Sequence, residues 1–423
     1  MEKTSLRSWQ YRIFTLLWTG YASYYLCRVN FAVAQPEMLK EFTDWTAAQI
    51  GLIPSVYAAC YAVGQFVNGQ IGEQLGARKM MTMAILMAAV TNLLFSQTSS
   101  YSMMLVLWGI NGFVQSAGWS LLVKTLSDWT TVRRRGFLIG LISTCYQVGN
   151  VMSWLLAGYL CQELGWRSAF WLPSLILFPM AVIFAIGLRN RPEDAGLPPV
   201  RDDLKTNHGD SKIAVVKMTA RQVLVETLTN RTLWILALGY FCMNSVRYAF
   251  MNWTVQYMAD FHGLSIKGSA FMAVALPLIG SVGAVSAGWA SDRLFDKRRA
   301  PVCAIMLFGL GLVCLAFLFV PQGAWGIATC LLGLAGFLVY GPDMLMSGAA
   351  SVDASNPSTA AASTGFIMSM GATGAIFSGA GVGLLKDLSG GKWDLIFMVL
   401  FGLSVLSGLL MVLIWNARPK SNS

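Results

Sequence analysis

The apolar residues of this chain are gathered into long runs, and this feature limits the folds that it can adopt. Twelve runs lie at about residues 11–35, 46–73, 80–98, 101–125, 137–162, 168–188, 232–258, 266–291, 301–320, 324–347, 358–385 and 393–416. A helix of about 20 apolar residues crosses the hydrocarbon core of a bilayer, so each run is a candidate span. The runs are continuous rather than alternating, which favours helices over a transmembrane barrel. We therefore predict an all-α membrane protein with twelve transmembrane helices.

The scarcity of charge supports this prediction. Only 12% of the 423 residues are charged and the mean hydropathy is +0.58, whereas soluble globular domains carry about 25% charged residues. A single soluble domain is excluded. The first run follows a basic segment but has no small-residue cleavage site, and it is longer than the apolar region of a signal peptide. We expect it to be retained as a membrane anchor.

The basic residues predict the orientation of the chain, because short cytoplasmic loops collect Lys and Arg. With the N-terminus inside, most of the 30 basic residues fall in cytoplasmic segments. The basic residues that would lie outside are Lys40, Arg167, Lys267, Lys386 and Lys392. Both termini are therefore predicted to be cytoplasmic. The net charge of +10 reflects this topology, since no basic patch with interleaved aromatic residues indicates nucleic-acid binding.

The sequence gives no indication of an enzyme, a metal site or a cofactor. All eight cysteines fall inside the apolar runs without paired spacing, and the two histidines, His208 and His262, fall in predicted loops. No nucleophile–base pair or phosphate-binding glycine loop occurs outside the runs. We expect no catalytic residues and no bound cofactor.

An internal repeat divides the chain into halves. The only long polar segment predicts residues 1–190 as an N-terminal six-helix bundle, 191–230 as a cytoplasmic linker and 231–423 as a C-terminal six-helix bundle. A constant offset of 219 places Arg28 on Arg247, Phe31 on Phe250, Glu41 on Asp260, Gly64 on Gly283, Glu73 on Asp292 and Arg78 on Lys297. Two repeated bundles with a site near the midplane are typical of secondary transporters.

Two arginines are the most unusual residues of the apolar runs. Arg28 and Arg247 each lie about 17 residues into a run, where a charge costs roughly 2.5–3.5 kcal/mol on insertion scales. They could bond backbone carbonyls or extend toward the membrane surface. The alternative is that the two guanidiniums clamp an anion, since their donors match phosphate oxygens. Asp343 is the clearest acidic residue within a run, and we expect it toward the cytoplasmic end rather than level with the arginines.

Further polar and aromatic residues within the runs are candidate substrate contacts. Tyr21 and Tyr25 share the helix face of Arg28, at i−7 and i−3. The other candidates are Gln115, Trp119, Tyr146, Asn244, Trp253, Tyr340 and Asp343. Any one of them could instead serve packing or contacts between helices.

A second repeated feature predicts a gate at the cytoplasmic ends of runs two and eight. Glu73 precedes Arg78 in one half, and Asp292 precedes Lys297 in the other. Such carboxylates could bond neighbouring helices in one conformation and release them in another. The alternative is that they are ordinary solvated loop charges.

At these residues the sequence resembles the organophosphate:phosphate antiporter family of the major facilitator superfamily. The resemblance runs almost end to end and rests on GYASYYLCRVNFAVAQP, the Gly112–Trp119 stretch, RPEDAGLPP, the Val246–Trp253 stretch, GWASDRLF and YGPDMLMSGAA. It implies the superfamily fold, with Arg28 and Arg247 as the ligands of a phosphoryl group and Tyr21 and Tyr25 beside them. It also implies a bacterial inner-membrane protein of many passes that works as a monomer.

The chain departs from this family where the substrate would bind. A His, a Lys, a second Lys, a Tyr and an Asp of the family pattern are replaced by Tyr146, Gln65, Val29, Ala372 and Asn252. Positive charge and a titratable group are thereby lost. A substrate less negative than a phosphate monoester dianion becomes plausible, such as a phosphodiester, a phosphonate or a zwitterion.

The predicted function is secondary active transport of a phosphorylated or phosphonate organic anion, in exchange for inorganic phosphate. Alternating access of two bundles around Arg28 and Arg247 would perform it. One alternative is a membrane sensor for an external organophosphate, which would share the fold. The other is a proton-coupled exporter of a lipid or drug, with Asp343 as the titrating group.

Overall fold

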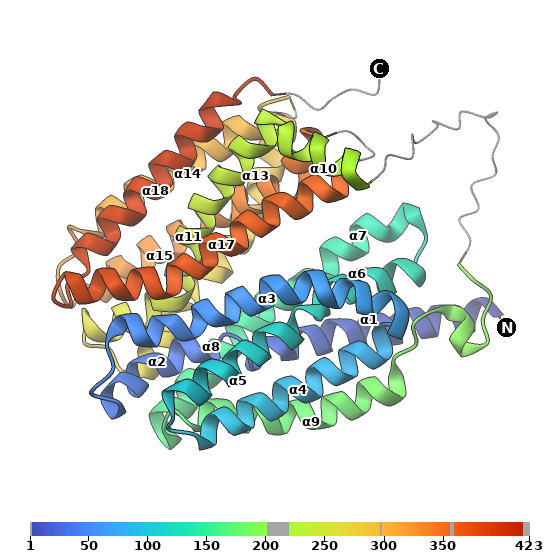
Figure 1. Ribbon diagram of the computed structural model, residues 1–423, viewed down its shortest axis with the longest axis horizontal. Helices are drawn as coiled ribbons and strands as arrows, with labels where there is room; N and C mark the ends of the chain where they lie inside the picture. Colours follow the sequence, from blue (N-terminus) through green and yellow to red (C-terminus); the bar gives the residue numbers. More distant parts are fainter. Residues whose placement is uncertain (1, 201–219, 297, 356–358, 418–423) are drawn as a thin grey trace. The chain divides into compact units, whose positions relative to one another are not determined.

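The fold of this protein is built from helices (Figure 1). The computed structural model describes residues 2–200, 220–296, 298–355 and 359–417, and none of these residues lies in a strand. The all-helical class predicted from the apolar runs is confirmed. The chain divides into two compact units, residues 1–41 with 56–209 as unit 1 and residues 42–55 with 210–423 as unit 2.

Unit 1 contains the helices of the first half of the chain. They are α1 (Glu2–Leu26), α2 (Asn30–Glu41), α3 (Ala47–Leu75), α4 (Ala77–Gln97), α5 (Tyr101–Gln115), α6 (Ala117–Asp128), α7 (Val132–Ile142), α8 (Thr144–Leu164), α9 (Ser168–Gly187) and the 3-10 turn η1 (Pro192–Ala195). Three predicted spans are interrupted, at 27–29, 116 and 143. The Ser116 and Ser143 hydroxyls bond the carbonyl oxygens of Phe113 and Ile139, each at 2.7 Å. Serine hydroxyls compete in this way with the regular helix ladder.

Unit 2 contains the helices of the second half. They are α10 (Ala220–Thr229), α11 (Arg231–Asp260), α12 (Ile266–Ala273), α13 (Ala275–Arg293), α14 (Arg299–Phe317), α15 (Trp325–Met344), the π-helix η2 (Leu345–Ala349), α16 (Ala350–Asp353), α17 (Ala360–Leu388) and α18 (Asp394–Leu413). Helix α11 begins at a well-formed cap, because the Asn230 side chain accepts bonds from the backbone N–H groups of Thr232 and Leu233. Unlike the first span, α11 is unbroken.

The first turns of α3 group with unit 2 because they bond α17. The Asp387 carboxylate accepts from the backbone N–H groups of Ala47 at 2.9 Å and Ala48 at 2.8 Å. Ser55 donates to the carbonyl oxygen of Ile376 at 2.5 Å. A Cβ at Gly379 would lie 2.4 Å from the Gly51 carbonyl oxygen, so only glycine permits this approach of the two helices.

The internal repeat appears in the packing of each unit. Helix α4 packs on α9 and α1 on α8 in unit 1, and the equivalent helices of unit 2, α14 with α18 and α11 with α17, pack in the same way. An ion pair also repeats. Arg167 bonds Glu41 at 2.6 Å in unit 1, and Lys386 pairs with Asp260 in unit 2, with both positions related by the offset of 219.

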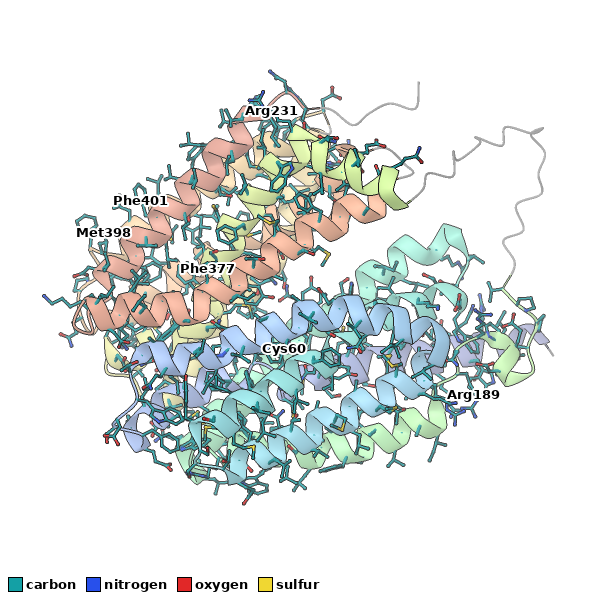
Figure 2. The ribbon with its side chains drawn as sticks, viewed as in Figure 1. Cys60, Arg189, Arg231, Phe377, Met398 and Phe401 are labelled. Carbon is teal, nitrogen blue, oxygen red and sulfur yellow. The ribbon has the colours of Figure 1, made fainter. Side chains whose placement is uncertain are left out.

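Large apolar side chains lie both inside the units and on their surfaces. Trp108 and Trp154 are fully buried, whereas Met398 of α18 is 53% exposed and Phe377 of α17 is 60% exposed. Figure 2 shows Met398 projecting from the outer side of α18. Exposed apolar side chains on this scale would be unfavourable in water, but they are suited to contact with lipid. They fit helices that cross a bilayer.

Eight helical segments of the described residues are long and apolar enough to cross a membrane. The four other predicted spans correspond to α1–α2, α5–α6, α7–α8 and α11. These four hold Arg28, Gln115, Tyr146 and Arg247, and three of them are broken into shorter helices. Polar residues within a span usually face the interior of a bundle rather than lipid.

Candidate substrate-binding site

Arg28 lies where the first span loses its regular helix. Helix α1 ends at Leu26 and α2 begins at Asn30. The Cys27 carbonyl oxygen accepts three side-chain amides, from Asn111 at 2.8 Å, Gln115 at 3.0 Å and Asn92 at 3.2 Å. An unpaired carbonyl inside a membrane costs several kcal/mol, so these amides make the break possible.

We call Asn30, Asn92, Asn111 and Gln115 the amide cluster. All four are at most 2% exposed. Asn30 donates to Asn92 at 3.2 Å, and Gln115 donates to Asn111 at 2.9 Å. The Tyr57 hydroxyl donates to Gln115 at 3.3 Å. Buried amides are tolerated when they bond one another, so the cluster fixes the backbone that carries Arg28.

The guanidinium of Arg28 is surrounded by aromatic rings. Its Cζ lies 4.6 Å from the ring centre of Tyr61, 5.2 Å from that of Tyr25 and 5.8 Å from that of Tyr57. No described carboxylate forms an ion pair with it. Ring faces attract a cation but do not neutralise it, so the positive charge of Arg28 is available to an anion.

The other predicted residues of unit 1 extend from this ring cage. Tyr21 contacts Tyr25 with ring centres 6.0 Å apart, and it contacts Trp119 at 5.5 Å. Trp119 contacts Tyr146 at 6.2 Å. The structure thus brings Tyr21, Tyr25, Trp119 and Tyr146 into one aromatic chain beside Arg28. Gln115 differs, because its amide is bonded within the amide cluster.

Arg247 has a different environment, dominated by Asp343. Its Nη1 lies 2.9 Å from Asp343 Oδ2, and both side chains are 16% exposed. The Tyr240 hydroxyl donates to the other carboxylate oxygen at 2.9 Å. Opposite charges at this distance and burial interact strongly, since little water screens them. The charge of Arg247 is therefore balanced within unit 2.

The expectation that Asp343 lies away from the level of Arg247 was wrong. The tenth span was predicted to end at residue 347, but the helical path continues through η2 and α16 to Asp353. Asp343 therefore lies ten residues before the end of that path and reaches Arg247 near the middle of α11. The extension depends on packing against α14 and α17, which hydropathy does not reveal.

Of the other candidate residues in unit 2, Tyr340 and Asn244 lie near Arg247, whereas Trp253 does not. The Arg247 Cζ lies 4.8 Å from the ring centre of Tyr340 and 5.4 Å from that of Tyr248. Asn244 lies one turn before Arg247, and its buried Oδ1 has no hydrogen-bond partner among the described residues. Trp253 lies elsewhere, with its indole N–H donating to the Ser378 carbonyl oxygen at 3.1 Å.

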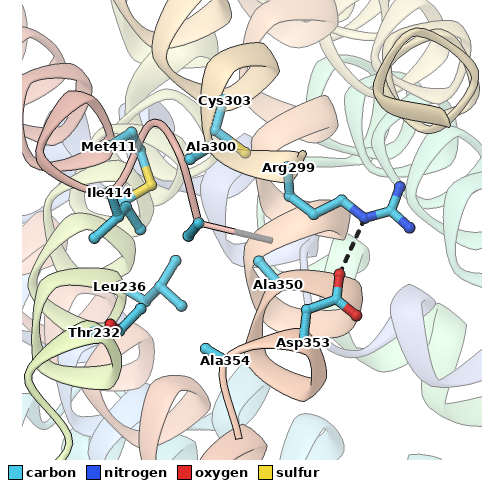
Figure 3. Close-up of a pocket in the computed structure, with 11 residues that line it drawn as sticks. Thr232, Leu236, Arg299, Ala300, Cys303, Ala350, Asp353, Ala354, Met411 and Ile414 are labelled. Atoms are coloured by element: carbon cyan, nitrogen blue, oxygen red, sulfur yellow. Dashed lines mark hydrogen bonds and ion pairs between the residues drawn. The ribbon is translucent and has the colours of Figure 1, made fainter. Parts of the chain in front are cut away.

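The predicted gate residues are described in part. In unit 2, Asp292 bonds Arg299 at 2.5 Å, and Arg299 also bonds Asp353 at 3.3 Å. Figure 3 shows Arg299 and Asp353 on the wall of a pocket whose other lining is largely apolar. In unit 1, Arg78 donates to the Ala185 carbonyl oxygen at 2.6 Å. The side chain of Glu73 and the whole of Lys297 lie outside what the structure describes.

Several residues of the site were missed by sequence reasoning. These are Tyr57, Tyr61, Tyr240, Tyr248 and three members of the amide cluster, Asn30, Asn92 and Asn111. A signal did exist for Tyr240, which the offset of 219 relates to Tyr21. Tyr248 adjoins Arg247 on α11, and Tyr57 and Tyr61 are one turn apart on α3. No periodicity, however, relates the residues of α3, α4 and α5 to Arg28.

Comparison with known proteins agrees with this architecture. The family model of the Major Facilitator Superfamily matches residues 17–379. A solved bacterial homologue of the human lysosomal transporter Spinster, inward-facing and unoccupied, superposes with a TM-score of 0.75 at 15% identity and covers 96% of both chains. That likeness concerns the fold alone. The chain belongs to the major facilitator superfamily of membrane transporters.

More specific relatives narrow the class. A probable hexose phosphate transport protein of Chlamydia pneumoniae is 28% identical, and the alignment covers 99% of this chain and 94% of that protein. The membrane sensor protein UhpC of Salmonella typhimurium is 30% identical, with 97% and 93% covered. A glycerol-3-phosphate transporter of Bacillus subtilis is 27% identical, with the same coverage. Within the superfamily, the chain is a member of the organophosphate:phosphate antiporter family.

Proposed function

We propose that this protein exchanges a phosphorylated or phosphonate organic anion for inorganic phosphate across the membrane. The proposal depends on the environment of Arg28. This cation lies deep in a span, with aromatic rings around its guanidinium and no carboxylate partner among the described residues. A buried charge of this kind is expensive and marks an ion or substrate path. Relatives named for hexose phosphate and glycerol-3-phosphate transport support the same class of ligand.

Arg28 and Arg247 are the proposed ligands of the phosphoryl group. Tyr21, Tyr25, Trp119 and Tyr146 would then contact the anion or its organic part from unit 1. Asn244 and Tyr340 would do so from unit 2, and Asp343 would border the bound group through its ion pair with Arg247. Gln115 acts through Arg28 rather than on the substrate, since its amide bonds the Cys27 carbonyl and Asn111. Trp253 is left with a packing role, because its N–H is already bonded to α17.

Transport proceeds by alternating access in this proposal. A buried guanidinium without an anion resists being enclosed, because enclosure removes its remaining water. A bound phosphoryl group neutralises it and lowers the cost of the occluded state, which is the differential interaction that a ligand-driven change requires. If only the loaded carrier crosses easily, exchange with phosphate follows. Asp292 and Arg78 would help to close the cytoplasmic side.

The proposed setting is the bacterial inner membrane, with both termini in the cytoplasm and the monomer as the working unit. Figure 2 shows Arg189 at the end of α9 and Arg231 at the start of α11, the two ends of the connection between the halves. Basic residues at these ends are typical of a cytoplasmic connection.

Counterflow in liposomes tests the proposal. Vesicles carrying the purified protein are loaded with labelled phosphate and challenged with phosphate monoesters, phosphodiesters and phosphonates, with an empty exterior as the control. Arg28→Ala and Arg247→Ala should each lower exchange by about 100-fold, because each loses charge-assisted hydrogen bonds. Arg189→Ala is the matched control, since the Arg189 guanidinium bonds the Ile186 and Leu188 carbonyl oxygens and lies outside the proposed site. Wild-type exchange in both site variants would refute the assignment.

A sensor is the second candidate, favoured by the relationship to UhpC of Salmonella typhimurium. A sensor would bind the organophosphate and signal to a partner without moving the ligand at a useful rate. Both candidates predict that Arg28→Ala weakens binding. Rapid counterflow by the purified wild-type protein would argue against the sensor, whereas tight binding without counterflow would favour it.

A further inference from the structure

The two repeated arginines have different charge environments, and the difference constrains the ligand. Arg28 has only aromatic rings around its guanidinium, whereas Arg247 forms an ion pair with Asp343. The sequence repeat places the arginines at equivalent positions but supplies the carboxylate in one half alone. Asp343 therefore affects the charge that a ligand meets at Arg247.

Asp343 is held at Arg247 by more than one contact. One carboxylate oxygen lies 2.9 Å from the guanidinium, and the other accepts the Tyr240 hydroxyl at 2.9 Å. Tyr240 is 4% exposed. Because its charge is paired with Arg247, the carboxylate has little net charge left for a cationic group of a substrate, which argues against a zwitterionic ligand at this point.

Arg247 nevertheless keeps a donor for an anion. Its Nε is buried and has no hydrogen-bond partner among the described residues, while Nη1 is occupied by Asp343. A guanidinium has five donors in a planar fork, so one edge can bind a carboxylate and another edge a phosphoryl oxygen. An anion at that edge would share the guanidinium with the carboxylate and would be repelled by it.

We infer that Asp343 is an internal competitor for Arg247 and that it selects organophosphates whose phosphoryl group carries one negative charge, as in a phosphodiester. The inference rests on the proposed function. Asp343 balances the charge of Arg247, so Arg28 supplies the remaining positive charge for the ligand. A doubly charged monoester would place a second negative charge near Asp343 without a cation to balance it. A diester still presents two non-bridging oxygens to the guanidiniums, with one charge fewer.

The position of Asp343 in its helix suits a group that responds to ligand. It follows Pro342 and precedes the π-helix η2, and the Ser347 hydroxyl bonds its backbone carbonyl at 2.6 Å. Proline and π-turns are places where a helix shifts its register or bends. A small rotation here would move the carboxylate along Arg247 as the anion enters.

Competition for labelled phosphate tests the inference. Glycerol 3-phosphate and its methyl diester share one alcohol and differ by about one charge at pH 7, because the second ionisation of a phosphate monoester lies near pH 6. The full-length protein in liposomes is assayed with each competitor. The wild type should prefer the diester, and Asp343→Asn should shift the ratio of the two inhibition constants toward the monoester by about tenfold or more.

Asp394→Asn is the matched control, since it removes a carboxylate from an exposed position at the start of α18. An unchanged ratio in folded Asp343→Asn would overturn the inference, and so would a wild type that prefers the monoester. The wild-type comparison holds even if the Asp343 variant does not fold. Failure of the proposed function looks different, because phosphate, the monoester and the diester would then all be inert with the wild type.

Discussion

Replacing Gln115 with leucine should disturb Arg28 without touching it. The substitution keeps the approximate size of the side chain and removes three hydrogen bonds: to the Cys27 carbonyl at 3.0 Å, to Asn111 at 2.9 Å and from Tyr57 at 3.3 Å. Side-chain hydrogen bonds inside membrane proteins average about 0.6 kcal/mol each. Three of them give about 2 kcal/mol, equivalent to a factor of about 30 in an equilibrium constant.

The loss should appear in two measurements. The midpoint of thermal unfolding of the purified protein should fall by several degrees, because the break in the first span loses one of its three amide donors. The kcat/KM for exchange should fall about 10- to 30-fold, because the Arg28 guanidinium is then positioned less precisely. Gln97→Leu is the control, since Gln97 is exposed at the end of α4 and bonds only Ser96 among the described partners.

A double-mutant cycle separates positioning from a direct substrate contact. Tyr57→Phe removes one of the same hydrogen bonds, so its effect and that of Gln115→Leu should be less than additive by about 0.6 kcal/mol. If Gln115→Leu keeps wild-type exchange and a wild-type unfolding midpoint, the amide cluster does not position Arg28. Full additivity with Tyr57→Phe would refute the bond between the two side chains.

Three further predictions concern the ends of the helices. Asp387→Ala should lower stability by about 1 kcal/mol in thermal unfolding, because α3 loses two cap bonds; an unchanged midpoint would contradict this. Lys386→Met should cost more than Arg167→Met, since the Lys386 side chain is 10% exposed and that of Arg167 36%; equal losses would show that burial does not decide. Burial holds the pKa of His262 below its usual value, so the unfolded chain binds the extra proton and stability should fall as pH drops below about 6.5; His262→Gln should flatten that dependence in unfolding midpoints measured from pH 7.5 to 5.5.

The sequence by itself determined the class of fold, and it singled out the two arginines that we propose as phosphoryl ligands. A membrane span depends on about 20 consecutive residues, so it can be predicted from the hydropathy of the local sequence. The internal repeat can likewise be found by comparing two segments of the sequence. It showed that Arg28 and Arg247 occupy equivalent positions, and their energetic cost in an apolar run drew attention to both. Tyr21 and Tyr25 followed from helical spacing alone.

Only the tertiary structure decided how each arginine is surrounded. The Cys27 carbonyl is bonded by side chains from α4 and α5, and Asp343 reaches Arg247 from a helix that begins about 80 residues later. Such contacts join segments distant in sequence, and they depend on helix breaks and extensions that hydropathy does not encode. Two arginines at equivalent positions of the repeat thus differ in charge environment, because packing places a described carboxylate beside Arg247 alone. Burial then strengthens that ion pair.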